Sequence, residues 1–86
     1  MDPDSIALAI ENFVRNAGAV AIDDASLTRT THLFDAGYVD SVTLVALSVF
    51  IEETFNVPVD EHDLFDPGFT TIGGMAKLVS SRLGDA

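Results

Sequence analysis

Residues 35–55 have the sequence DAGYVDSVTLVALSVFIEETF, and the rest of the chain is organised around them. Gly37 can adopt backbone angles that other residues avoid, so the chain can turn sharply there. Asp40 and Ser41 both have short side-chain oxygens that can accept hydrogen bonds from the free N–H groups of a helix's first turn. No Gly or Pro follows until Pro58, so the stretch predicts a helix of about four turns that starts beside a hydroxyl and a carboxylate.

This predicted helix is apolar on two opposite sides. Successive residues turn by about 100°, which places on the expected core side Leu44, Leu47, Ile51 and Phe55. The other side should be polar on an isolated surface helix, but it is apolar and ends in two glutamates: Val42, Val45, Ala46, Val49, Glu52 and Glu53. Either the helix is buried all round or this second side meets another protein. Because a chain of 86 residues has little material to cover both sides, we favour a partner.

A first helix is predicted before this stretch. Asp2 can cap it, Pro3 suits its first position, and Gly18 can end it. Its expected apolar face consists of Ile6, Ile10, Phe13, Val14 and Ala17.

A last helix is predicted after it, capped by Thr70 or Thr71 and running to Leu83. Gly73 and Gly74 either allow close packing of this helix or leave its first turn loose. Its expected inner stripe consists of Ile72, Met75 or Ala76, Val79 and Leu83.

The connections between these helices differ in length. Residues 19–34 lack a sustained period, and the apolar residues expected to anchor them to the core are Ile22, Leu27, Leu33 and Phe34. A strand is conceivable at 19–22, but no second alternating run exists to pair with it. Residues 60–65 predict a single helical turn with Leu64 and Phe65 packed inward, followed by a turn at 66–68. We therefore expect an all-α fold, a small four-helix bundle with a long first loop and a short third helix.

Length and charge limit the function classes. The 86 residues fit one domain, 1–86, with one small core. With 14 acidic and 4 basic residues the net charge is -10, which would repel nucleic acid and anionic membranes. This charge would either attract basic partners or serve only to keep a small protein soluble. The chain has no Cys, which fits the cytoplasm and excludes disulfides and thiolate chemistry of its own. Neither a secretory signal nor a membrane-spanning stretch is expected.

Catalytic and metal sites are poorly supported. Ser41 lacks a G-x-S-x-G setting, and although spacing alone permits a triad with His32 or His62, a small helical chain leaves little room for an oxyanion hole. The same histidines, with Asp35 or Asp63, lack paired metal-ligand spacing. The acidic turn also lacks the alternating ligands and the glycine of a calcium loop: Asp60, Glu61 and Asp63. We expect neither an enzyme nor a metal site.

Residues 33–59, LFDAGYVDSVTLVALSVFIEETFNVPV, resemble the acyl carrier and peptidyl carrier proteins. The shared pattern is a glycine, a short gap, Asp-Ser with an apolar residue, and a helix that ends in acidic residues and Phe. Here these are Gly37, Asp40, Ser41, Val42, Glu52, Glu53 and Phe55. The acidic turn and the FTTI helix start at 69–72 also match, so the resemblance extends from Ile6 to Leu83 and implies a bundle of the acyl-carrier type.

The resemblance implies that Ser41 accepts a 4'-phosphopantetheine arm from coenzyme A through a separate phosphopantetheinyl transferase. The arm's thiol would hold an acyl or aminoacyl cargo as a thioester and present it to an acyltransferase or adenylation ligase and a downstream synthase. Asp40 would cap the helix and help to position the transferase, while Tyr38 and Val39 would border the arm. The expected docking face is Val42, Val45, Ala46, Val49, Glu52 and Glu53.

Two departures from the usual family pattern indicate which kind of carrier the chain resembles. Val42 replaces the more usual Leu or Met, and Thr43 and Ala46 stand where fatty-acid carriers often have acidic residues. The opening at 33–41 looks more like stand-alone carriers of specialised pathways, which suggests polyketide or nonribosomal peptide assembly and a monomer when free. The alternative is an acidic helical adaptor in which Ser41 is only a helix cap. An independent hydrolase ranks third.

Overall fold

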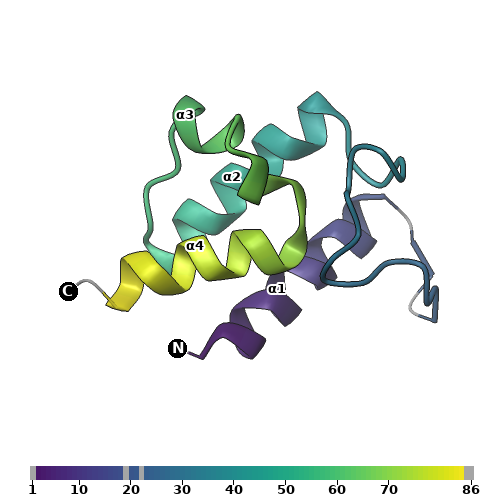
Figure 1. Ribbon diagram of the computed structural model, residues 1–86, viewed down its shortest axis with the longest axis horizontal. Helices are drawn as coiled ribbons and strands as arrows, with labels where there is room; N and C mark the ends of the chain where they lie inside the picture. Colours follow the sequence, from purple (N-terminus) through teal and green to yellow (C-terminus); the bar gives the residue numbers. More distant parts are fainter. Residues whose placement is uncertain (1, 19, 22, 85–86) are drawn as a thin grey trace.

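The computed structural model describes residues 2–18, 20–21 and 23–84, and Figure 1 shows their arrangement. Its elements are α1 (Pro3–Ala17), α2 (Ser41–Phe55), α3 (Glu61–Leu64), the 3-10 helix η1 (Pro67–Thr70) and α4 (Ile72–Gly84). No strand occurs in the described residues, so the predicted all-α bundle with a long first loop and a short third helix is confirmed. Ile22, one predicted anchor of that loop, lies outside the described residues.

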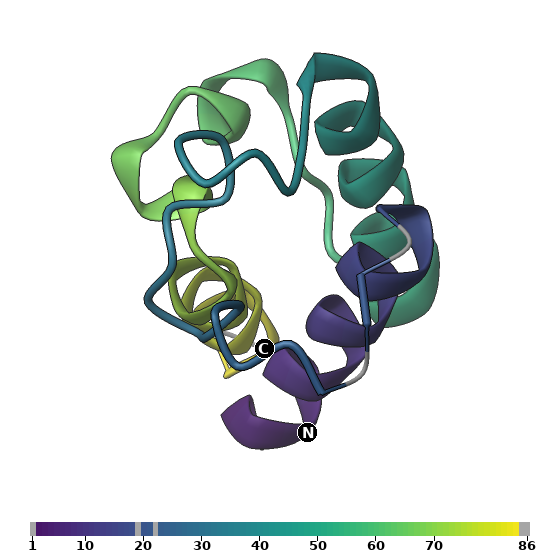
Figure 2. The same ribbon diagram turned by 90° about the vertical axis from the view of Figure 1, so that its right-hand side faces the viewer.

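The core is formed where α1, α2 and α4 face one another, as the end-on view in Figure 2 shows. α1 packs against α4 and also against α2, while η1 packs on α4. Their fully buried side chains include Ile6, Ile10, Val14, Leu47, Ile51, Ile72, Met75 and Val79. The predicted inner faces of the three long helices are thus confirmed, except that Ala17 is exposed and that Phe13 and Leu83 are half-buried.

Short polar side chains start the helices, as the sequence predicts. Asp2 caps α1 and accepts a hydrogen bond from the Asp4 N–H at 2.7 Å. Thr71 accepts one from the Gly74 N–H at 2.9 Å at the start of α4. Gly18 is the C-cap of α1. Each cap satisfies backbone groups that a helix end leaves without partners.

The two glycines of α4 allow close packing, which decides between the two roles considered for them. A Cβ at Gly74 would collide with the carbonyl oxygen of Gly68 in η1. The Gly73 N–H donates to the Arg29 carbonyl at 2.9 Å, so the long first loop lies directly on α4. These contacts hold the loop and η1 against the same end of the last helix.

Two aromatic residues expected in the core lie at the surface instead. Phe65 is 85% exposed and Phe34 is 38% exposed. α3 is a single turn that ends at Leu64, and consecutive residues of a helix point about 100° apart, so Leu64 is half-buried against the core while Phe65 turns outward. Leu33 takes the core position beside Phe34, with 0% exposure. The predicted turn at 66–68 is the start of η1.

Candidate functional site

Ser41 is the first residue of α2, and its side chain is exposed. The preceding residue, Asp40, is the N-cap: its backbone is extended, and its Oδ1 accepts from the Thr43 N–H at 2.8 Å. The capping role that the sequence left open between the two residues therefore falls to Asp40. The Ser41 hydroxyl is not needed to close the helix start.

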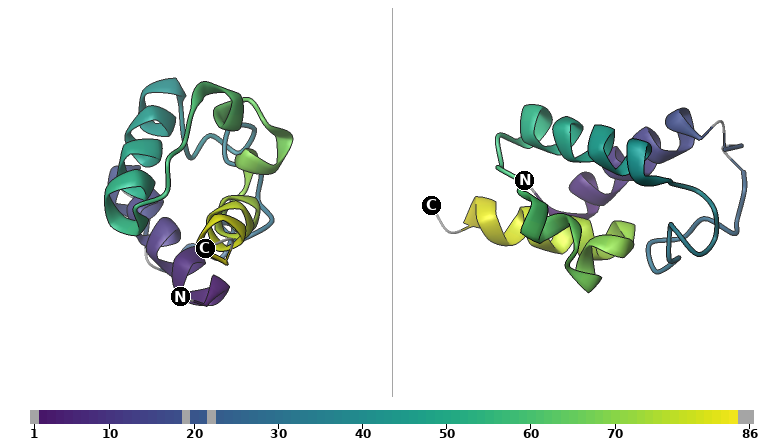
Figure 3. Two further views of the ribbon diagram at one scale, coloured as in Figure 1. Left: turned by 90° about the vertical axis from the view of Figure 1, so that its left-hand side faces the viewer. Right: turned by 90° about the horizontal axis from the view of Figure 1, so that it is seen from above.

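The turn that precedes Ser41 is fixed by backbone hydrogen bonds. Gly37 has φ +82°, a conformation that favours glycine, which confirms the predicted sharp bend. The Tyr38 N–H donates to the Leu33 carbonyl at 2.9 Å. The Leu33 N–H in turn donates to the Thr70 carbonyl at 2.9 Å, which ties this loop to η1. The right-hand view of Figure 3 shows this loop leading into the start of α2.

An apolar cleft with a volume of about 230 Å³ opens beside the Ser41 hydroxyl. It lies between α2, the loop before it and the α3 turn, and is lined by Phe34, Ser41, Leu44, Val45, Leu64 and Phe65. The sequence analysis missed Phe34 and Phe65 as site residues because it assigned both to the core. The 100° step between consecutive residues gives the Leu64 and Phe65 side chains different directions, but it does not say which of the two faces the core. A larger hollow of about 360 Å³ between α1 and α4 does not include Ser41.

The charge beside Ser41 is a stable carboxylate. The pKa of Asp40 is lowered below the ordinary 3.8, mainly by the hydrogen bond from the Thr43 backbone N–H and then by one from the Thr43 side chain. Asp40 is therefore ionised at neutral pH, next to the exposed hydroxyl. The helix N-terminus partly offsets this charge, because its N–H groups favour anions.

The outer face of α2 is exposed along its length. Val42, Val45 and Val49 are 78%, 54% and 45% exposed, and Ala46 and Glu53 are exposed as well. These residues form one surface next to the cleft, and their predicted role in docking stays a prediction. Because they are largely apolar, recognition through this surface would depend on shape and apolar contact.

Three other residues predicted for docking have structural partners. Val39 is only 6% exposed and belongs to the core, so its side chain offers almost no surface to a partner. Tyr38 is half-buried, and its hydroxyl donates to Asp24 at 3.2 Å. Glu52 is half-buried and accepts from the Val59 N–H at 2.8 Å. The long-range contacts that hold these side chains are not visible in the local sequence.

Of the residues considered for metal binding, His32 and Asp35 lie close together, with 3.7 Å between His32 Nδ1 and Asp35 Oδ2. Over residues 2–18, 20–21 and 23–84, no three His, Asp or Glu side chains gather as they would around a metal ion. His32 Nδ1 accepts a hydrogen bond from the Asp35 N–H at 3.2 Å, so this histidine stabilises the loop turn that contains it. Within the same residues, no helix has the length and apolar character needed to cross a lipid bilayer.

Residues 17–79 match a protein family described as "Phosphopantetheine attachment site". The match covers most of the 86-residue chain, which therefore belongs to this family. None of the curated proteins compared with the chain matches it. Members of the family carry 4'-phosphopantetheine covalently on a serine, and they generally act as carriers that work with a phosphopantetheinyl transferase and synthase partners. Membership does not favour the adaptor alternative.

The residues around Ser41 fit this cofactor. An exposed hydroxyl is available for attachment, and the helix N-terminus favours the charge of a phosphate. The adjoining apolar cleft gives the uncharged part of such a group a surface to lie on.

Proposed function

We propose that Ser41 is the serine to which 4'-phosphopantetheine is attached and that residues 1–86 act as a single carrier domain. When bound, the cofactor supplies a terminal thiol that holds an acyl or aminoacyl cargo as a thioester. The chain itself does no chemistry on the cargo. The observation that supports this proposal is the exposed Ser41 hydroxyl at the first position of α2, beside the cleft and within the region that matches the family.

A comparison of the serines in the matched region supports the choice of Ser41. That region contains Ser26, Ser41 and Ser48. Ser48 is 6% exposed, and its hydroxyl donates to the Val45 carbonyl at 2.6 Å, so a transferase could not reach it. Ser26 lies in the first loop, where neither a helix N-terminus nor an apolar cleft receives an attached phosphate.

The neighbouring residues have distinct tasks in this proposal. Asp40 closes the helix start, which leaves the Ser41 hydroxyl free for modification. The cleft shields the apolar part of the arm or its cargo from water, with Phe65 and Phe34 at its edge. The exposed valines Val42, Val45 and Val49 receive the transferase and the enzymes that load and accept cargo.

We further propose a role in polyketide or nonribosomal peptide assembly, as a free-standing carrier that is monomeric in the cytoplasm. The resemblance of residues 33–41 to stand-alone carriers supports this, together with an outer α2 face that is apolar where fatty-acid carriers often have acidic residues. The loading partner would be an acyltransferase or an adenylation ligase.

The attachment site can be tested by intact mass. The wild-type chain, incubated with coenzyme A and a broad-specificity phosphopantetheinyl transferase, should gain one phosphopantetheine, whereas Ser41→Ala should gain none. Ser26→Ala is the matched control and should be modified like the wild type. Ser41→Ala should stay within about 0.5 kcal/mol of wild-type stability, because Asp40 provides the cap. Modification of folded Ser41→Ala, or none of the wild type, would contradict the proposal.

A further inference from the structure

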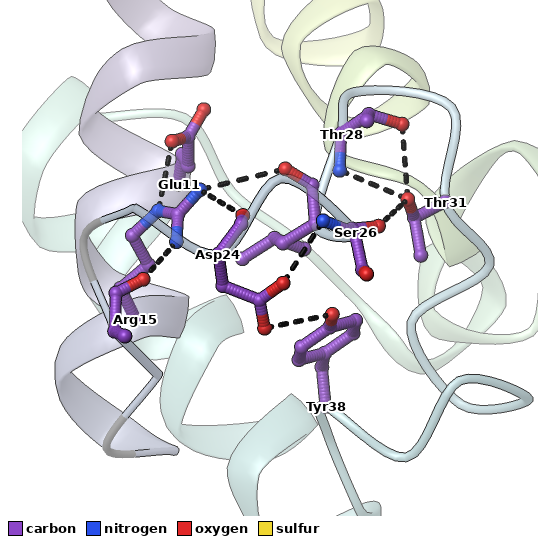
Figure 4. A network of polar contacts seen from close by, with 9 residues as sticks. Glu11, Arg15, Asp24, Ser26, Thr28, Thr31 and Tyr38 are labelled. Atoms are coloured by element: carbon purple, nitrogen blue, oxygen red, sulfur yellow. Dashed lines mark hydrogen bonds and ion pairs between the residues drawn. The ribbon is translucent and has the colours of Figure 1, made fainter.

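Tyr38 lies three residues before Ser41, the proposed attachment residue, and contacts the first part of the chain at two points. Its hydroxyl donates to Asp24 Oδ2 at 3.2 Å, as Figure 4 shows. Its carbonyl oxygen lies against Gly18, the C-cap of α1, where an added Cβ would come within 3.3 Å of it. Tyr38 therefore lies between the segment that leads to Ser41 and the end of α1.

Asp24, which accepts from the Tyr38 hydroxyl, is itself firmly held. Its other carboxylate oxygen accepts from the Ser26 N–H at 2.9 Å, and its carbonyl accepts from Arg15 Nη2 at 3.2 Å. The side chain of Arg15 is 11% exposed and forms an ion pair with Glu11 at 2.9 Å. Figure 4 shows the guanidinium between α1 and the loop. The Tyr38 hydroxyl is thus connected, through Asp24 and Arg15, to the body of α1.

The hydrogen bond between Tyr38 and Asp24 is the link between the segment that leads to Ser41 and the first part of the chain. Over the part of the chain that the structure describes, the Tyr38 hydroxyl makes the one side-chain hydrogen bond from residues 37–40 to residues 2–31. The other hydrogen bonds of residues 37–40 stay within their own loop or reach the first turn of α2. Burial first, and then the Asp24 carboxylate, raise the pKa of Tyr38 above the ordinary 10.0, so the hydroxyl remains a donor at neutral pH.

We infer that Tyr38 and Asp24 are positioning residues. They hold residues 37–41, the segment that ends at Ser41, in one orientation relative to α1, and this is the orientation that the transferase binds. The inference rests on the proposed function and replaces the docking role predicted for Tyr38. Without the hydrogen bond, the segment would populate several orientations. The transferase would then bind only the competent fraction, which raises the apparent KM and leaves kcat nearly unchanged once the carrier is bound.

The test is the steady-state kinetics of phosphopantetheinylation, with the carrier as the varied substrate. Tyr38→Phe, which keeps the ring and removes only the hydroxyl, should raise KM about three- to tenfold, the factor that one net hydrogen bond contributes. Asp24→Ala should behave in the same way, and Asp24→Asn, which keeps an acceptor for the hydroxyl, should restore most of the wild-type KM. Because one bond is removed in either case, Tyr38→Phe combined with Asp24→Ala should be little worse than either change alone.

Arg29→Gln provides a matched control in the same loop. It removes an exposed ion pair with Asp4 and leaves the Tyr38–Asp24 contact intact, so KM should not change. A second measurement, amide hydrogen exchange, does not involve the transferase: the Val39 N–H, which donates to the Leu33 carbonyl at 3.3 Å, should exchange faster in Tyr38→Phe than in the wild type.

The outcomes separate this inference from the proposed function. Unchanged KM or unchanged exchange in Tyr38→Phe, with the wild type modified at Ser41, would overturn the positioning role alone. A KM increase of equal size in Arg29→Gln would also overturn it, because general loosening of the loop would then suffice. A folded wild type that is not modified at Ser41 would overturn both.

Discussion

At Ser41 an exposed hydroxyl starts a helix that its neighbour already caps. Asp40 accepts from the Thr43 N–H at 2.8 Å, and this contact lowers the pKa of its carboxyl group. Either residue could have capped the helix, and here Asp40 provides the cap. The proposed attachment of a group to Ser41 would therefore leave the start of α2 capped by Asp40.

Asp40→Ala should lower the Tm at neutral pH, because the first turn of α2 loses its cap. Asp40→Asn keeps a side-chain acceptor and should lose less. Thermal unfolding followed by circular dichroism would measure both. An Asp40→Ala protein as stable as the wild type would mean that Ser41 or water can replace the cap.

At the scale of the elements, α2 is a helix that is apolar on both sides for two different reasons. Its inner side chains, such as Leu47 at 0% exposure, hold the core together. Its outer valines remain exposed beside Ser41. Periodicity alone distinguishes these two sides, but not which of them a second protein covers.

Val45→Asp should leave the fold intact and weaken transferase binding, because Val45 is 54% exposed and lines the cleft. We expect the KM of the transferase to rise about tenfold or more, since a charge would replace an apolar contact at an interface. Leu47→Asp, on the inner side of the same helix, is the matched contrast and should unfold the chain. An unfolded Val45→Asp protein, or wild-type kinetics, would contradict the assignment of this face.

In α4, Gly74→Ala should destabilise the protein by about 1–3 kcal/mol, although alanine is normally the better helix former. The added Cβ would collide with the Gly68 carbonyl and displace η1. Gly84→Ala, at a position where a Cβ would meet nothing within 4 Å, is the control and should be neutral. Urea unfolding of both variants would measure the difference. A stabilised Gly74→Ala would show that η1 can move away at little cost.

At the scale of the whole molecule, side chains from distant segments set the shape of the site. Arg82 of α4 binds both carboxylate oxygens of Asp63 in α3, at 2.7 and 2.8 Å. This pair fixes the α3 turn, and with it Phe65, at the edge of the cleft. Arg15 performs a similar task for the first loop, where it donates to the carbonyls of Asp24 and Leu27. Three of the chain's four basic residues form ion pairs with its acidic side chains.

Arg82→Gln should reduce stability by about 1 kcal/mol at neutral pH, the upper range for an exposed pair. Hydrogen bonds from Arg82 lower the pKa of Asp63 below the ordinary 3.8. The stabilisation by this ion pair is therefore complete above pH 3.8, the ordinary pKa of the unfolded chain. It is lost as the pH falls through the lower pKa that Asp63 has in the folded protein. Urea midpoints of the two proteins should differ at pH 7 and converge in acid. A difference that persists at low pH would exclude the ion pair as its cause.

The sequence by itself determined the number and order of the helices, the caps at Asp2 and at Thr70 or Thr71, the inner face of α2 and the position of its start beside Ser41. These features depend on hydrogen bonds and periodicity within a few neighbouring residues, so a local pattern is sufficient to predict them.

Only the tertiary structure decided that Phe65 faces outward, that Val39 belongs to the core and that Tyr38 bonds to Asp24. It also decided that Gly74 receives the Gly68 carbonyl. Each of these depends on which distant segment covers a given side chain. In a loop or a single helical turn no long apolar period specifies the buried side, so the packing of the longer helices determines it.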